Sequence, residues 1–174
     1  MERGLREGLQ ASKSELNMLK LSYKIFGFFS GENMIVRNCS GGIVFVGDKV
    51  LIVCNDKHEW SFPKGTVKTD SDLSLSSFAR DRVKIETGVE AKVIAPCGKT
   101  NYEFYSISRM KPVHNNISWF VMQTSSEECK ADPESGTIEC KFVEIARALD
   151  EITYSQDKSL LMMAYQKYRE SLKS

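Results

Sequence analysis

The sequence predicts a single α/β domain, and three features carry this prediction: a pair of short apolar runs, a helix that ends at a glycine, and a second helix near the C-terminal end. The apolar runs at residues 43–46 and 50–53 are separated by Gly47 and Asp48, which is the pattern of a β-hairpin. A chain of 174 residues is long enough for one domain with a hydrophobic core.

The first helix is predicted to begin near residue 71 or 72, where serine and aspartate are good N-caps, and to end at Thr87 before Gly88. Its buried face is expected to include Phe78, Val83 and Ile85.

The remaining elements alternate between strands and helices. Strands are expected at about 89–97, 102–109, 116–123 and 139–143, a polar loop at 125–136, and helices at 145–149 and 158–172. The last helix is expected to pack a methionine-containing face on the core through Leu160, Leu161, Met163, Ala164, Tyr168 and Leu172.

Residues 1–33 are predicted to form an N-terminal helical extension that precedes the main domain at 34–174. Within this extension, residues 3–21 have a broken helical period, and residues 23–29 are unusually apolar. This apolar segment is expected to pack on the main domain, to form a homodimer, or to bind a protein partner.

Composition narrows the class of protein and its partners. The charged and apolar fractions, 27% and 41%, are typical of a soluble globular protein, and a net charge of +1 predicts neither bulk nucleic-acid binding nor membrane binding. No apolar run approaches the roughly 18 residues that cross a bilayer. Five cysteines without C-x-x-C spacing indicate reduced thiols in a cytoplasmic or nuclear compartment, with Cys54 and Cys97 in the core.

Residues 60–65, which read Trp-Ser-Phe-Pro-Lys-Gly, and the helix that ends before Gly88 resemble the signature of the Nudix (MutT-like) hydrolase superfamily. Residues 40–53 resemble the opening hairpin of that family. Residues 113–122 resemble a later strand of diadenosine tetraphosphate hydrolases and diphosphoinositol-polyphosphate phosphatases. The resemblance covers about residues 36–168 and implies an α/β/α sandwich with a mixed central sheet.

In this family the helix carries glutamates at positions i, i+3 and i+4, which therefore share one face. Their carboxylates hold divalent cations that neutralise a diphosphate while water attacks. In this chain Glu86 matches the last glutamate, but Arg82 and Ile85 stand at the other two positions and Asp81 stands at the arginine of the motif. The earlier glutamate of the motif has no acidic match either. The resemblance therefore implies a degenerate Nudix box.

We expect weak or absent hydrolysis from this set of residues. Glu86 is the remnant of the catalytic and metal site, and Arg82 at i, i+4 is expected to pair with it as an ordinary helix-surface ion pair. An arginine in place of a carboxylate favours an anion, so Lys64, Gly65 and Arg82 are predicted to bind the phosphate of a nucleotide or an inositol phosphate without metal. The competing interpretation of Lys64 is a solvated loop lysine.

An active Mg2+- or Mn2+-dependent pyrophosphohydrolase with non-standard ligands is the alternative. Glu86 would then act with Glu139, at a position that is often acidic in the family, or with Glu134. Asp81 is a poorer partner for Glu86, because five residues place the two side chains about 140° apart around a helix. If the helix were shifted by one residue against the motif, Glu86 would likewise be rotated away from the other ligand positions. No cofactor is expected if activity is lost.

Overall fold

The computed structural model describes residues 34–68 and 74–173. The chain divides into two compact units: the smaller contains Phe104–Val113, and the larger contains Val36–Glu103 and His114–Ser174. The predicted extension at 1–33, with its apolar segment 23–29, lies outside the described residues.

Seven strands of the described chain form one sheet. The strands are β1 (Ile35–Val46), β2 (Lys49–Asn55), β3 (Trp60–Ser61), β4 (Lys64–Thr66), β5 (Lys92–Ser106), β6 (Lys111–Gln123) and β7 (Thr137–Glu144). The helices are α2 (Leu75–Thr87), α3 (Ile145–Glu151) and α4 (Ser155–Ser171), with a 3-10 turn η2 (Pro133–Ser135).

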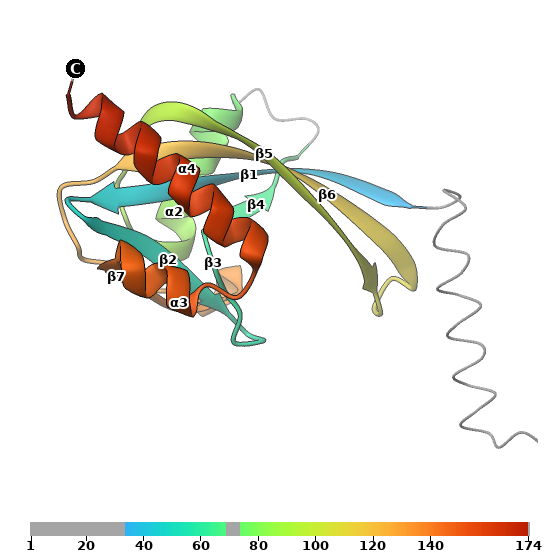
Figure 1. Ribbon diagram of the computed structural model, residues 1–174. Coiled ribbons are helices and arrows are strands. Elements are labelled where there is room, and N and C mark those ends of the chain that lie inside the picture. Colours follow the sequence, from blue (N-terminus) through green and yellow to red (C-terminus); the bar gives the residue numbers. More distant parts are fainter. Residues whose placement is uncertain (1–33, 69–73, 174) are drawn as a thin grey trace, which may run out of the picture. The chain divides into compact units, whose positions relative to one another are not determined.

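The sheet has the order β3-β2-β1-β6-β5, with β4 paired to β1 and β7 paired to β2. The pairs β1–β2, β1–β4, β2–β3 and β2–β7 are antiparallel. Strands β1 and β6 run in the same direction (Figure 1), so the sheet is mixed. The predicted hairpin is confirmed, and Gly47 at its turn has a φ of 55°.

Alternate residues of the central strands face two separate cores, as the two-residue period of a strand requires. Phe45 and Ile52 belong to the core that packs against α3 and α4, whereas Val44 and Leu51 belong to the core that packs against α2. Helices therefore cover both faces of the sheet (Figure 1), and the predicted α/β/α sandwich is confirmed.

Helix α2 ends as predicted, because Gly88 takes the left-handed conformation at a φ of 68° and its amide donates to the Lys84 carbonyl oxygen. Its N-cap is Ser74, whose hydroxyl accepts from the Ser77 amide. The predicted start at residue 71 or 72 lies outside the described residues. The prediction that Ile85 is buried is wrong, because this side chain is 51% exposed.

Two further predictions need correction. The strands expected at 89–97 and 102–109 are joined in the continuous β5, where Gly98 takes a φ of 102° without ending the strand. On the predicted core face of the last helix, Met163 and the C-cap residue Leu172 are 50% and 54% exposed and do not belong to the core, whereas the other four predicted residues are buried. The core residues of this helix are Leu160, Leu161, Ala164 and Tyr168.

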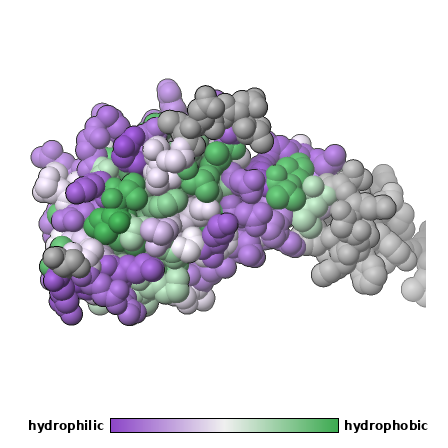
Figure 2. All heavy atoms as spheres, turned by 90° about the horizontal axis from the view of Figure 1, so that it is seen from above, coloured by the Kyte–Doolittle hydropathy of each residue, from purple (hydrophilic) through white to green (hydrophobic). Residues whose placement is uncertain are grey.

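Cys54 and Cys97 are buried as predicted, and all five cysteines are free thiols. Apolar side chains are interspersed with polar ones over the face shown in Figure 2. In the part of the chain that the structure describes, no helix combines the length and apolarity that a membrane span requires.

Candidate functional site

The loop at residues 60–65 packs so closely on β1 that Gly41 has no room for a side chain. Strand β4 pairs with β1 so that Lys64 lies opposite Gly41, and the Gly42 amide donates to the Pro63 carbonyl oxygen at 3.1 Å. A Cβ at Gly41 would lie 2.7 Å from that oxygen and 2.8 Å from the Cβ of Lys64. The double glycine therefore brings the Lys64 backbone against β1 and fixes where this side chain starts.

The side chain of Arg82, on α2, packs on the backbone of Gly65. A Cβ at Gly65 would lie 2.7 Å from Cδ and 3.0 Å from Cζ of Arg82, so the arginine packs directly on the glycine backbone. The Nε of Arg82 is buried and has no hydrogen-bond partner among the described residues. Such a donor costs about 1–3 kcal/mol, which indicates that packing and charge, and not a full set of hydrogen bonds, hold this side chain.

Glu86 has a partner at each carboxylate oxygen. Nη2 of Arg82 donates to Oε1 at 2.6 Å, and the hydroxyl of Thr137 on β7 donates to Oε2 at 3.3 Å. The Glu86 side chain is only 6% exposed. Burial raises the pKa of Glu86, although the charge and hydrogen bond of Arg82, the charge of Lys64 and the hydrogen bond of Thr137 all act to lower it.

The predicted pair between Arg82 and Glu86 is therefore confirmed, but the prediction that it is an ordinary surface pair is wrong. Thr137 could not be predicted as a partner of Glu86 from the sequence, because it lies on a strand 51 positions away. A long-range contact of this kind depends on the sheet topology and not on helical spacing.

The Lys64 side chain contacts a hydroxyl group and lies near an aromatic ring. Its Nζ donates to Oγ of Ser61 at 3.1 Å and lies 6.0 Å from the ring centroid of Trp119. The charge of Lys64 acts to lower the pKa of Glu86 and the pKa of Asp157. For Asp157 the effect of burial is larger, so its pKa is raised overall.

A second cluster of polar side chains, which the sequence did not predict, connects the loop before β3 to the loop before α4. Glu59 accepts from the Tyr154 hydroxyl at 2.6 Å and from the Asn55 amide at 2.9 Å. These hydrogen bonds lower the pKa of Glu59, with a smaller effect from Lys64, and the Glu59 hydrogen bond raises the pKa of Tyr154 to about 12.

The other candidate residues lie apart from Glu86. Glu139 is an exposed residue of β7 that forms an ion pair with Lys141 at 3.9 Å, and Glu134 is an exposed residue of η2. Asp81 pairs with Arg80 at 3.2 Å. Among the described residues, no group of three histidine, cysteine or acidic side chains is placed to hold a metal ion.

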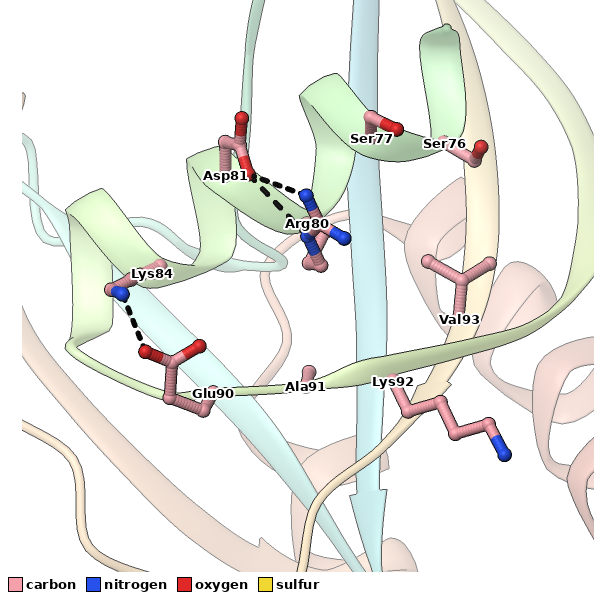
Figure 3. A pocket seen from close by; sticks show the side chains of 9 residues that line it. All are labelled: Ser76, Ser77, Arg80, Asp81, Lys84, Glu90, Ala91, Lys92 and Val93. Atoms are coloured by element: carbon pink, nitrogen blue, oxygen red, sulfur yellow. Dashed lines mark hydrogen bonds and ion pairs between the residues drawn. The ribbon is translucent and has the colours of Figure 1, made fainter.

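A separate surface groove of about 630 Å³ lies between the outer face of α2 and the start of β5 (Figure 3). The groove does not include Lys64, Arg82 or Glu86. Four of its charged side chains pair within it, Arg80 with Asp81 and Lys84 with Glu90 at 2.5 Å, and Lys92 also lines it. We therefore place the candidate site at Lys64, Arg82 and Glu86 and not in this groove.

No family model and no curated protein matches the sequence. Solved structures are similar to it in fold at low sequence identity. Dihydroneopterin triphosphate pyrophosphohydrolase of E. coli is 13% identical with a TM-score of 0.60, over 73% of this chain and 94% of that chain. The Nudix domain of Shewanella oneidensis NrtR, solved with ADP ribose, is 14% identical with a TM-score of 0.60, over 84% and 97% of the two chains.

An Ap4A hydrolase of C. elegans, solved as a binary complex, is 16% identical with a TM-score of 0.55 and matches 78% of this chain and 97% of that chain. Each neighbour is matched over nearly its whole length by the same three-layer arrangement of helices and sheet. The chain therefore has the fold of the Nudix superfamily.

Proposed function

We propose that this protein binds a phosphate-bearing ligand, of the nucleoside diphosphate class, without a divalent metal and with weak or absent hydrolysis. One observation carries the proposal: both carboxylate oxygens of Glu86 are engaged by protein donors, Oε1 by Arg82 and Oε2 by Thr137. Each of these oxygens keeps a second lone pair, but a metal ion that used it would share the carboxylate with a guanidinium, and a magnesium site usually joins one or two carboxylates to substrate oxygens.

The residues present do not fit the metal site of an active Nudix box. The guanidinium of Arg82, 2.6 Å from Glu86, would repel a divalent cation. Ile85, at the second of the three glutamate positions, offers no oxygen ligand and is exposed. Glu139 stays a proposed ligand only for the alternative, an active hydrolase with non-standard ligands.

Lys64 is the proposed phosphate contact. An ammonium group has three donors, and Ser61 accepts only one of them at 3.1 Å, so two remain for phosphate oxygens. Lys64 acts on two other carboxylates: Glu59 is already hydrogen-bonded by Tyr154 and Asn55, and burial raises the pKa of Asp157. Arg82 and Gly65 would form the opposite wall.

The choice of ligand class follows a neighbour, since the similar NrtR domain was solved with ADP ribose. The first test is calorimetric titration of the full chain with ADP-ribose in excess EDTA. We expect binding, and we expect Lys64→Met to weaken it roughly tenfold, because a hydrogen bond to a charged group contributes about 1.5–3 kcal/mol. Lys92→Met, in the separate groove, is the matched control and should bind as the parent does.

The second test is hydrolysis with Mg2+ or Mn2+ of diadenosine polyphosphates, capped RNA, nucleoside triphosphates and diphosphoinositol phosphates. Turnover near roughly one per second is ordinary for an enzyme. Such turnover, if it disappeared in Glu86→Gln, would overturn the proposal in favour of the active hydrolase. If the parent protein did not bind ADP-ribose in excess EDTA, the proposal that binding needs no metal would be overturned.

A further inference from the structure

Strand β5 lies at one end of the sheet. It pairs with β6 on one side, and no other strand in the described part of the chain pairs with its second side. Pro96 lies within the strand, and a proline inside a strand is typical of a sheet edge, because it has no amide hydrogen to donate. An open edge of this kind presents backbone donors and acceptors with which another strand can pair.

A contact with α4 shows which residues of β5 face the open side. The carbonyl oxygen of Asn101 accepts from the side-chain amide of Gln156 at 3.3 Å. A strand residue directs its amide and its carbonyl to the same side, so the backbone of Asn101 faces the open edge and not β6. Lys99 and Glu103, two residues before and after it, face the same way, and all three residues are exposed.

We propose that residues 99–103 pair with the same residues of a second copy of this chain, as antiparallel strands around a twofold axis at Asn101. In this register Asn101 lies opposite Asn101 of the other copy, and Lys99 of each copy lies opposite Glu103 of the other. A twofold interface contains every contact twice, so the dimer has two such Lys–Glu pairs.

The charges favour this register over the neighbouring ones. Opposite charges directly across two strands stabilise the pairing, and like charges destabilise it. A shift by two residues would place Asn101 opposite a charged residue and would lose both ion pairs. A shift by four would place either Lys99 or Glu103 opposite its own copy, which is repulsive.

The Glu103 side chain is already held in position within its own copy. Its Oε1 lies 2.9 Å from Nδ1 of His114 on β6, which leaves Oε2 for Lys99 of the other copy. A carboxylate held in this way loses less conformational entropy when it forms the second contact.

The opposite face of the paired strands is complementary as well. There Thr100 of one copy would lie opposite Tyr102 of the other, and a β-branched residue opposite an aromatic one is a favourable cross-strand pair. The Tyr102 side chain is 41% exposed, and the Thr100 hydroxyl accepts from Nε1 of Trp119 at 2.7 Å. Both faces of the segment therefore fit a second copy.

Sedimentation equilibrium of the full chain tests the dimer and its charges. We expect the parent to dimerise in a concentration-dependent way. Lys99→Glu and Glu103→Lys each place like charges opposite each other twice, so each should raise the dissociation constant of the dimer at least roughly tenfold. An equimolar mixture of the two variants should dimerise about as well as the parent, because each variant then complements the other in both pairs.

The matched control is Lys92→Glu, which makes the same charge change at the exposed start of β5, outside the paired segment. This variant should dimerise as the parent does. The proposal is overturned if the parent is monomeric at every concentration at which it stays in solution, as it would be if another part of the chain covered this edge. It is also overturned if the mixture of variants fails to regain the dimer.

Asn101→Pro tests whether the strands themselves pair. It removes the central amide of the pairing segment without a change of charge, and the fold should persist because this amide faces away from β6. We expect this variant to be monomeric where the parent is a dimer, with an unchanged urea unfolding curve at a concentration where both are monomers. A dimer that survived Asn101→Pro would overturn strand pairing as its basis.

Discussion

Nη2 of Arg82 lies 2.6 Å from Oε1 of Glu86, one helical turn away, and the glutamate side chain is only 6% exposed. An exposed i, i+4 pair contributes a few tenths of a kcal/mol, but removal of one partner from a buried pair leaves an uncompensated charge. Removal of Arg82 is therefore expected to destabilise the fold of this chain.

Arg82→Ala is expected to destabilise the protein by about 2–4 kcal/mol, which is less than for a fully buried pair because Arg82 is partly exposed. Urea unfolding at pH 7 measures the change. The matched control is Arg80→Ala on the same helix, whose ion pair with Asp81 is exposed on both sides, and whose loss should cost less than about 0.5 kcal/mol. Equal losses of stability in the two variants would show that the Arg82–Glu86 pair contributes no more than an exposed ion pair does.

The buried carboxyl group of Glu86 predicts a pH dependence of stability. Its pKa in the folded protein is raised above its ordinary value of 4.5, mainly by burial, so the folded state keeps a proton that the unfolded state has lost. The corresponding stability is fully present below about pH 4.5 and is lost as the pH rises through the raised pKa of the folded state.

Glu86→Gln removes this titration, so the free energy of unfolding of the variant should rise relative to that of the parent as the pH increases from 4.5 to 7. Urea unfolding at several pH values measures the difference. Glu90→Gln, at an exposed carboxylate, is the control. A constant difference between Glu86→Gln and the parent over this range would contradict a raised pKa.

The sequence predicted the first hairpin and the Arg82–Glu86 contact because both depend on local periodicity, whereas the sandwich was implied by the resemblance of residues 36–168 to the Nudix family. Apolar runs around a turn define a hairpin, and four residues define neighbours on a helix. The sequence could not predict the burial of Glu86, which depends on β7. It also misplaced Ile85, because two residues rotate a helix by about 200°, so that Ile85 points away from the face of Val83.

The close packing of Arg82 on Gly65 predicts a coupled response to substitution. Gly65→Ala would place a Cβ against the arginine side chain, and we expect it to cost about 1–3 kcal/mol by overpacking. In the Arg82→Ala background the same substitution has free space and should cost much less. A double-mutant cycle by urea unfolding measures the coupling. Additive effects would mean that the two residues do not constrain each other.

Restoring the carboxylates tests whether the ligands alone separate this chain from a metal-binding Nudix fold. Arg82→Glu with Ile85→Glu places carboxylates at positions 82, 85 and 86, which share one helical face with i, i+3 and i+4 spacing. We expect the double variant to bind Mn2+ in calorimetric titration, with an affinity at least about tenfold above that of the parent, because three oxygen ligands then replace a guanidinium, a hydrocarbon and an engaged carboxylate.

The single variant Ile85→Glu is the matched control. Ile85 is half exposed, so the substitution should cost less than about 0.5 kcal/mol of stability, and it should leave Mn2+ binding as weak as in the parent because Arg82 still holds Glu86. If Ile85→Glu alone bound Mn2+ as well as the double variant, Arg82 would not be what blocks the metal. If the folded double variant failed to bind, Thr137 and the burial of Glu86 would have to exclude the ion by themselves.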